Sequence, residues 1–510
     1  MADNHNFRVK NGLEVGDDVA VTGNIAVSGT VDGVDIAARD AVLTSTTTTA
    51  GAALPKAGGT LTGDVTFAAG ADLITTTAGT SNLRLGVDAG TNLASGSTGN
   101  TFVGDNAGKD NTTGDNNAAV GKGALENNTT ASNNTAVGYA SLSANTTGAS
   151  NIAVGTYSLD SNTTGASNTA VGTYSLGANT TGANLVGLGY GVLYANTTAA
   201  NNTGVGYFAL GNNTTGASNV AVGALALDAN TTASNNTAVG DGSLGANTTG
   251  ASNTAVGKGA LEKNTTANAN VAVGMEALFT NTTGQSNSAI GFRTMYANTT
   301  GSNNMGIGQA SLRYSTTGNN NLAIGVQSLF ANTTGSSNVG LGLHALYTNV
   351  TGSFNTASGT QALKFTTAAD NTAMGGQAGM AVTSGTLNSF FGKASGSLVT
   401  TGSKNTILGA FDGNENGLDI RTSSNNIVLA DGDGNPRLII NSSGAATFAS
   451  TVNGRNIATD GTKLDAIEAS ATADQTNAEI RTAVEAATDS NVFTDADHSK
   501  LNAIEASATA

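Results

Sequence analysis

The sequence has 510 residues, of which 69 are glycine and only 11% are charged, and its formal net charge is −15. Large apolar residues are too few to build several globular cores, and the acidic balance argues against nucleic-acid binding, which needs a basic surface. Because the chain has no cysteine, disulfides, metal–thiolate sites and thiol nucleophiles are excluded. These properties favour a repeat architecture.

The N-terminal region predicts short β-strands followed by a linker. Apolar and polar residues alternate from Phe7 to Val31, with glycines at the turns, so residues 1–43 are interpreted as a β-strand attachment module. Residues 44–85 are rich in Thr, Ala and Gly and predict a linker with short strands. The chain does not begin with a basic, then apolar, leader, and no stretch approaches the ~20 apolar residues of a membrane-spanning helix. We therefore predict synthesis and assembly in a cytoplasm, without membrane insertion.

A glycine recurs every 17 residues from Gly104 to Gly359, and weaker copies follow at Gly375, Gly392 and Gly409 after one shortened spacing. The consensus reads N-x-A-V-G-x-x-[AS]-L-x-x-N-T-T-G-x-x. Seventeen residues are too few for a βα unit but suit one coil of short strands and turns, and stacked coils share a continuous core. The sequence therefore predicts an all-β fold whose shaft, residues 86–410, is a parallel β-solenoid in an elongated fibre.

The residues before each repeat glycine predict which side chains face inward. The first and third residues before the glycine are often large and apolar, whereas the second is Ala or Gly from Ala119 to Ala357. Alternate residues of a strand share a face, so we expect the large residues to point inward and the small ones to contact another subunit. The predicted interface residues are Ala119, Ala136, Ala153, Ala170, Ala221, Ala238, Ala255 and Ala272.

Asparagine recurs at two positions of the repeat, in the N-T-T-G segment (for example Asn145) and before the strand (for example Asn134). In stacked coils identical Asn side chains come into register and can hydrogen-bond along the stack as ladders. Each N-T-T also matches the N-glycosylation pattern. The structural interpretation is favoured because the motif is part of the repeat period.

The sequence offers few residues that could take part in catalysis or bind a metal ion. Asp431, Asp433 and Asn435 imitate the start of a calcium loop, but Ser442 stands where the loop's glutamate belongs, which favours a tight turn. The three histidines fall in different regions: His5, His344 and His498. We therefore assign no catalytic, cofactor-binding or metal-binding residue and expect neither a cofactor nor enzyme activity.

Aromatic residues recur directly after the repeat glycine and five residues after it. Stacked rings could hold the sugar rings of a surface glycan, and packing within the turns of the solenoid is the alternative interpretation. The candidate glycan contacts are Tyr139, Tyr190, Tyr207 and Phe292.

The C-terminal part predicts a β-rich cap over residues 411–459 and an acidic helical or coiled-coil segment over residues 460–510. Asp495 and Asp497 are interpreted as residues at a helix N-terminus, where acids are favoured. The segment KLDAIEASATA at Lys463–Ala473 returns nearly unchanged at Lys500–Ala510, where the sequence stops. From this we expect the native polypeptide, or a partner, to continue beyond Ala510.

Two resemblances accompany these patterns. The core S-N-T-A-V-G, as in Ser167–Gly172 and Ser252–Gly257, resembles the repeat of the YadA-like head of trimeric autotransporter adhesins, which implies a homotrimer of left-handed β-rolls. Leu54–Asp64 (LPKAGGTLTGD), Asp460–Ala473 and Phe493–Ala510 are similar to segments of bacteriophage tail fibres, including those of T4-like phages of marine cyanobacteria.

The resemblances imply a structural virion component, a tail fibre involved in host-cell attachment. The expected partners are two further copies of the chain, other tail or baseplate proteins, and a glycan or protein of the host surface. The alternatives are a bacterial surface adhesin of YadA-like type and an adaptor fibre that carries a separate receptor-binding tip protein.

Overall fold

The computed structural model describes residues 81–449 without a break and several shorter pieces on either side. Contacts divide the chain into two units, residues 1–74 and 75–510. In the first unit, β1 (Thr30–Val31) pairs antiparallel with β2 (Val34–Asp35). The predictions for the rest of residues 1–80 lie outside the described residues. The described parts of the second unit are the solenoid (81–449), the pair β28 (Thr451–Val452) and β29 (Arg455–Asn456), residues 477–479 and 482, and the helix α4 (Asp495–Ala508).

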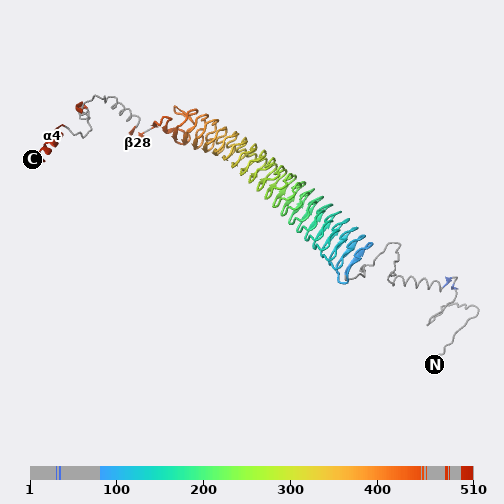
Figure 1. Cartoon of the computed structure of the whole chain (residues 1–510). Helices are drawn as coiled ribbons and strands as arrows, with labels where there is room; N and C mark the ends of the chain where they lie inside the picture. Colours follow the sequence, from blue (N-terminus) through green and yellow to red (C-terminus); the bar gives the residue numbers. More distant parts are fainter. Residues whose placement is uncertain are drawn as a thin grey trace, which may run out of the picture. The chain divides into compact units, whose positions relative to one another are not determined.

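The solenoid is a stack of short parallel strands, each paired with the strand of the next coil (Figure 1). The expected 17-residue register holds along most of the stack, with spacings of 18 between β3 and β4, 16 between β19 and β20 and 21 between β22 and β25. The predicted parallel β-solenoid is thus confirmed. Its three-residue strands are β3 (Leu83–Leu85), β4 (Thr101–Val103), β5 (Ala118–Val120), β6 (Thr135–Val137), β7 (Ile152–Val154), β8 (Thr169–Val171), β9 (Val186–Leu188), β10 (Thr203–Val205), β11 (Val220–Val222), β12 (Thr237–Val239), β13 (Thr254–Val256), β14 (Val271–Val273), β15 (Ser288–Ile290), β16 (Met305–Ile307), β17 (Leu322–Ile324), β18 (Val339–Leu341), β19 (Thr356–Ser358), β20 (Thr372–Met374), β21 (Ser389–Phe391) and β22 (Thr406–Leu408).

The stack ends in a change of strand direction. A small hairpin of β23 (Asn414–Glu415) and β24 (Leu418–Asp419) is inserted before β25 (Ile427–Ala430), the last parallel strand. Strands β26 (Pro436–Ile440) and β27 (Ala446–Phe448) then pair antiparallel on the edge of β25. The edge of β25 is therefore covered by β26, which runs in the opposite direction.

The C-terminal helix α4 begins at Asp495, as the acidic residues at its start predict. Within the described parts of the chain, none of the helices is both long and apolar enough to span a bilayer.

Each coil presents three outward faces around a narrow interior, and we number its positions from the repeat glycine (position 0). The sheet face comprises positions −3 and −1, the turn face positions +1, +2, +5 and +6, and the threonine face positions +8, +9, +11 and +12. In the coil of Gly172 these are, respectively, Thr169 and Val171; Thr173, Tyr174, Gly177 and Ala178; and Thr180, Thr181, Ala183 and Asn184. The buried residues of the same coil are Asn168, Ala170, Ser175, Leu176, Asn179 and Gly182, and Gly177, which has no side chain to extend from the turn face, is buried as well.

The predicted orientation of the strands is wrong. The alanines expected at a subunit interface are completely buried inside a single chain, whereas the large residues beside them are exposed: Ala238 is 0% exposed and Val239 37%. Ala238 belongs to the same core cluster as the leucines at position +4, so its methyl group is not available to another subunit. The correction applies to all eight alanines: Ala119, Ala136, Ala153, Ala170, Ala221, Ala238, Ala255 and Ala272.

The interior combines an apolar column with the two asparagine ladders that the sequence predicts. Leucines at position +4 stack from Leu125 to Leu363, with Met295 in one coil. In one ladder the buried Asn145 donates from Nδ2 to Oδ1 of Asn128 at 2.8 Å, and the pattern repeats from coil to coil. In the other, the backbone N–H of Asn151 donates to Oδ1 of Asn134 at 2.9 Å. The N-T-T asparagines are therefore structural, buried side chains.

Candidate functional site

Aromatic side chains gather on the turn face of five consecutive coils. Six of the nine tyrosines of the chain fall between residues 139 and 207. The turn itself places them on the surface, because the +2 residues Tyr157, Tyr174 and Phe208 adopt positive φ angles of 54–59°. Successive coils then bring these rings next to those at positions +1 and +5.

The rings form one continuous series along the stack. Tyr139 meets Tyr157 edge-on at 5.2 Å between centroids, and Tyr157 stacks on Tyr174 at 5.5 Å. Tyr174 then contacts both Tyr190 at 6.1 Å and Tyr194 at 6.2 Å, edge-on in each case. The series ends at Tyr207 and Phe208, which lie 5.8 and 6.1 Å from Tyr190. These distances are typical of favourable aromatic pairs.

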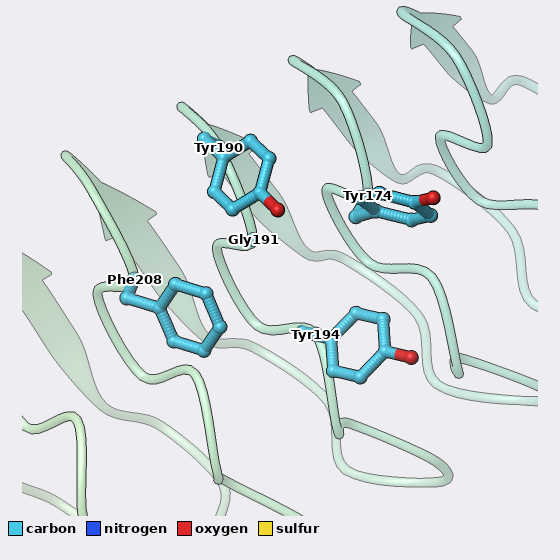
Figure 2. A pocket seen from close by; sticks show the side chains of 5 residues that line it. All are labelled: Tyr174, Tyr190, Gly191, Tyr194 and Phe208. Carbon is cyan, nitrogen blue, oxygen red and sulfur yellow. The ribbon is translucent and has the colours of Figure 1, made fainter.

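Two adjoining hollows open between these rings. One, of about 160 Å³, is lined by Tyr174, Tyr190, Gly191, Tyr194 and Phe208, and Figure 2 shows its four rings arranged around Gly191. The other, of about 310 Å³, shares Tyr174 and Tyr194 with the first and is completed by Tyr157, Asp160, Ser161, Gly177 and Ala178. We call the two together the tyrosine groove.

Gly191 creates the first hollow by leaving out a side chain. It stands at position +2 with a φ of 62°, the position that carries an aromatic ring in Tyr157, Tyr174 and Phe208. A Cβ atom at Gly191 would lie 2.7 Å from a ring carbon of Phe208. The +2 row of rings is thus interrupted by one coil, and the gap is walled by aromatic groups on both sides.

The groove carries one charged side chain. Asp160 is the only charged residue between Tyr139 and Phe208 in the sequence. Its carboxyl group lines the larger hollow, and burial raises its pKa above the ordinary value, an effect opposed by hydrogen bonds from the backbone N–H groups of Asp160 and Ser161. The groove therefore combines ring surfaces, phenolic hydroxyls and one carboxylate.

A second aromatic series, farther along the stack, has a different character because cations cover it. Phe279 and Tyr296 stack at 5.2 Å, and the guanidinium of Arg293 lies 5.5 Å from the Tyr296 ring. Arg293 also forms an ion pair with Glu276 at 2.5 Å. Beyond it, Phe330 and Tyr347 stack at 5.0 Å.

The structure brings three of the four candidate glycan contacts together. Tyr139, Tyr190 and Tyr207 belong to the first ring series, whereas Phe292 lies in the second region, where Arg293 covers its ring at 5.1 Å. The prediction missed Tyr157, Tyr174 and Phe208. Their recurrence at position +2 in three of four consecutive coils is a sequence signal that would have found them.

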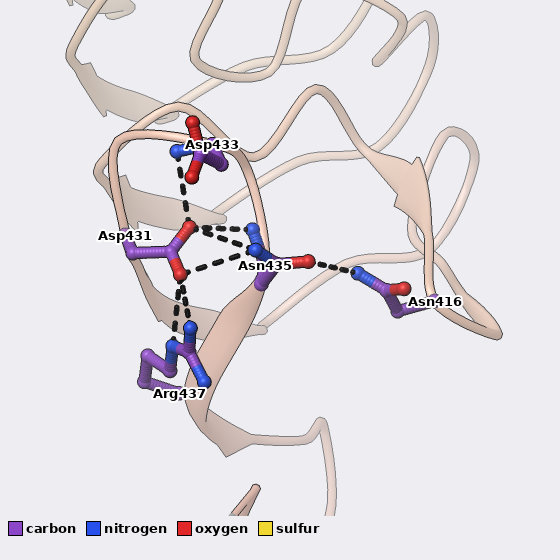
Figure 3. A network of polar contacts seen from close by, with 5 residues as sticks. All are labelled: Asn416, Asp431, Asp433, Asn435 and Arg437. Atoms are coloured by element: carbon purple, nitrogen blue, oxygen red, sulfur yellow. Dashed lines mark hydrogen bonds and ion pairs between the residues drawn. The ribbon is translucent and has the colours of Figure 1, made fainter.

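The Asp431–Asn435 segment is a tight turn, as predicted, and joins β25 to β26. The carboxylate of Asp431 accepts hydrogen bonds from the backbone N–H groups of Asp433 and Asn435, from the Asn435 amide and from Arg437 (Figure 3). The Asn435 side chain and Arg437 lower the pKa of Asp431 to about 2. Its oxygens are thus engaged inside the turn.

Among the described residues, no three His, Asp or Glu side chains lie close enough together to hold a metal ion. His344 lies in a coil, where its Nε2 is 2.8 Å from the Oε1 of Gln327 in the preceding coil, and His498 belongs to α4. No protein-family model matches the sequence, and no significant match is found among curated proteins.

Proposed function

We propose that this chain is the shaft subunit of a bacteriophage tail fibre, a structural component of the virion without catalytic activity that helps the particle reach its host's surface. The flanking segments that resemble tail fibres support the viral assignment. The observation that carries the fibre assignment is the sheet face of the solenoid.

The sheet face is an uncharged strip with an apolar row along position −1. On strands β4 to β22 none of the outward positions −3 and −1 carries a charge, and most of the −1 positions are Val, Ile or Leu. Ile290, for example, is 41% exposed and Leu408 is 55% exposed. Parallel sheets occur almost only with both faces covered, and large exposed apolar patches mark contact surfaces. The strip supports burial against another molecule.

Copies of the same chain fit this strip best. A partner can match it over its whole length only if its own side chains repeat at the spacing of the coils, and a second copy has that spacing by construction. Closed symmetric assemblies are the rule for homo-oligomers, and the resemblance to the YadA-like head favours three copies. The proposed homotrimer is thus held by the sheet face, in place of the buried alanines.

Immunogold labelling with an antibody against residues 86–410 tests the assignment. On purified phage particles we expect gold along a tail fibre, and on uninfected bacteria of the same culture we expect none. Labelling of the bacterial envelope would contradict the proposal and support the surface-adhesin alternative. Gold on a fibre that carries a second, unlabelled protein at its tip would indicate the adaptor alternative.

A further inference from the structure

We propose that the tyrosine groove is a binding site for a neutral saccharide. This assignment goes beyond the shaft function, because a shaft needs only coil stacking and the sheet face. The groove lies on the turn face of the coils, so the sheet face remains free for assembly.

The shape of the groove suits a ligand that is flat and partly apolar. In the smaller hollow, Tyr174 and Phe208 stand on either side of Gly191, with Tyr190 and Tyr194 alongside (Figure 2). Its volume of about 160 Å³ is that of roughly five water molecules at ~30 Å³ each, the size of one sugar ring. A pyranose has an apolar C–H face that stacks on an aromatic ring, and hydroxyl groups around its edge.

The polar groups of the groove match those hydroxyls. The phenolic groups of Tyr174 and Tyr194 both donate and accept hydrogen bonds, and both rings line the two hollows. Asp160 and Ser161 line the larger hollow, where a carboxylate accepts hydrogen bonds from sugar hydroxyls. Few convergent polar groups on an apolar floor are typical of small-ligand sites.

The charge of the tyrosine groove argues against other ligands that stack on aromatic rings. Nucleic acid also stacks on aromatic side chains, but its phosphates require a positively charged groove. Asp160 is the only charged residue from Tyr139 to Phe208, so this region has no cation, and an acidic sugar would be repelled. The second aromatic series, with Arg293 over its rings, lacks this selectivity.

The series of rings extends the site along the stack. Rings from Tyr139 to Phe208 follow one another at 5.2–6.1 Å across five coils. An oligosaccharide lying along the solenoid axis therefore meets an aromatic surface at each successive unit, with the hollow over Gly191 taking one ring. Each copy in an oligomer presents one such groove, so a multivalent surface is bound more tightly than a single saccharide.

The test uses the full chain and linear trisaccharides of glucose, galactose, mannose and N-acetylglucosamine, with a sialylated trisaccharide as the anionic probe. Because the protein has no tryptophan and six of its nine tyrosines lie between residues 139 and 207, tyrosine emission comes mainly from the ring series, and calorimetry gives the affinity. We expect at least one neutral probe to bind and the anionic probe not to bind. Failure of every neutral probe at millimolar concentration, or binding of the anionic probe alone, would overturn the proposal.

Substitutions test whether the saccharide binds in the tyrosine groove. Gly191→Tyr adds a ring at the φ that neighbouring coils use for an aromatic residue. The Phe208 ring has to move aside, because the new Cβ would lie 2.7 Å from it, and we expect the filled hollow to abolish binding. Tyr194→Ala and Asp160→Asn, both at the surface, should each weaken binding about tenfold or more. Tyr347→Ala, which removes a stacked ring outside the groove, is the matched control and should bind as the wild type does. Unchanged affinity in Gly191→Tyr or Tyr194→Ala would overturn the proposal whatever the assembly state of the shaft.

Discussion

The repeat glycine is fixed by the close approach of the neighbouring coil. Gly223 has a φ of +138°, and a Cβ atom there would lie 2.5 Å from the carbonyl oxygen of Gly240. The same clash recurs from coil to coil, because every repeat glycine faces the next one. The strict 17-residue spacing of glycine thus has a steric cause.

Gly223→Ala should destabilise the solenoid by about 2–4 kcal/mol, because it adds both a strained φ and a backbone overlap. Gly242→Ala is the matched control: its φ is +65°, and the nearest atom to an added Cβ is 3.8 Å away. Thermal and denaturant unfolding compare the two. Equal unfolding midpoints in the two variants would contradict the steric explanation.

The asparagine ladder that links side chain to side chain, described above for Asn128 and Asn145, is interrupted at two coils. Oδ1 of Asn298 and Oδ1 of Asn349 are buried without a hydrogen-bond partner. Each precedes a coil in which the ladder asparagine is replaced, by Ser315 and by Thr366 respectively. The shorter side chains at these positions do not continue the ladder.

Ser315→Asn should stabilise the solenoid by about 1–2 kcal/mol, because the new amide can donate to Asn298 and accept from Asn332. The unfolding midpoint measures this gain. Ser315→Ala serves as the control, since it removes a hydroxyl that itself lacks a partner without supplying an amide. A midpoint that does not rise in Ser315→Asn would refute the ladder account.

At the scale of elements, the turn between β25 and β26 depends on one ionised carboxylate. Asp431 has a pKa of about 2, below its ordinary value of 3.8, because the Asn435 side chain and Arg437 bind its charged form. A folded pKa below the unfolded one means that the interaction stabilises the turn above pH ~4 and is lost as the pH falls through ~2.

We therefore expect β26 and β27 to open on acidification from pH 4 to pH 2. Limited proteolysis by pepsin, which is active in this range, should cut near β26 in the wild type only toward the lower pH. In Asp431→Asn the cutting should be equally fast at both pH values, once corrected with an unstructured peptide. A wild-type profile as flat as that of Asp431→Asn would disprove the role of this carboxylate.

The repeat, the parallel stacking and both asparagine ladders could be predicted because they depend on period and register alone. Which strand residues point inward could not be predicted, because that depends on the width of the interior. A Cβ atom added at Gly187 would lie 2.6 Å from Oγ of Ser175, and one added at Gly204 would lie 2.4 Å from Val192. In these two coils even a methyl group at this position would overlap a neighbouring side chain, so the larger residues of the strand lie outside.

The candidate site was predicted only in part, because its geometry also depends on how the turns fold. The rings directly after the repeat glycine were recognised, whereas those at position +2, such as Tyr174, were not. The contact of Tyr174 with Tyr190 and Tyr194 arises only after the positive-φ turn is formed. The hollow over Gly191 likewise follows from a missing side chain, which a search for recurring aromatic residues does not detect.

At the scale of the whole molecule, the sheet face should control assembly. The triple variant Val222→Asp, Val239→Asp and Val256→Asp places three charges on adjacent coils of the strip, where like charges of neighbouring copies would meet in a desolvated contact. We expect the wild type to sediment as a trimer and this variant as a monomer in analytical ultracentrifugation.

The matched control carries the same three charges on the exposed threonine face: Thr215→Asp, Thr232→Asp and Thr249→Asp. It should remain trimeric. Trimers in both variants would remove the sheet face from the interface, and a monomeric wild type would contradict the assembly itself.

A whole coil should be dispensable. Deleting residues 241–257 joins Gly240 to Lys258 and keeps every remaining position in register, so stacking energy is lost for one coil only. We expect an unchanged circular-dichroism spectrum and a melting temperature within a few degrees of the wild type. Deleting only residues 241–248 misaligns the leucine column and should unfold the adjoining coils; a folded product in that case would contradict the one-dimensional account.

The parallel pairing of successive coils also determines how the solenoid responds to a pulling force. Its inter-coil hydrogen bonds run along the stack, so a pull on the two ends stretches them and opens the coils one at a time instead of shearing many together. A stacked coil contributes about 4.8 Å of length, whereas its 17 residues reach about 56–61 Å when drawn out. A solenoid of this kind is an extensible tether. Each coil that unfolds lengthens the chain by more than ten times the thickness of the coil. The tension then falls, and the remaining coils stay folded.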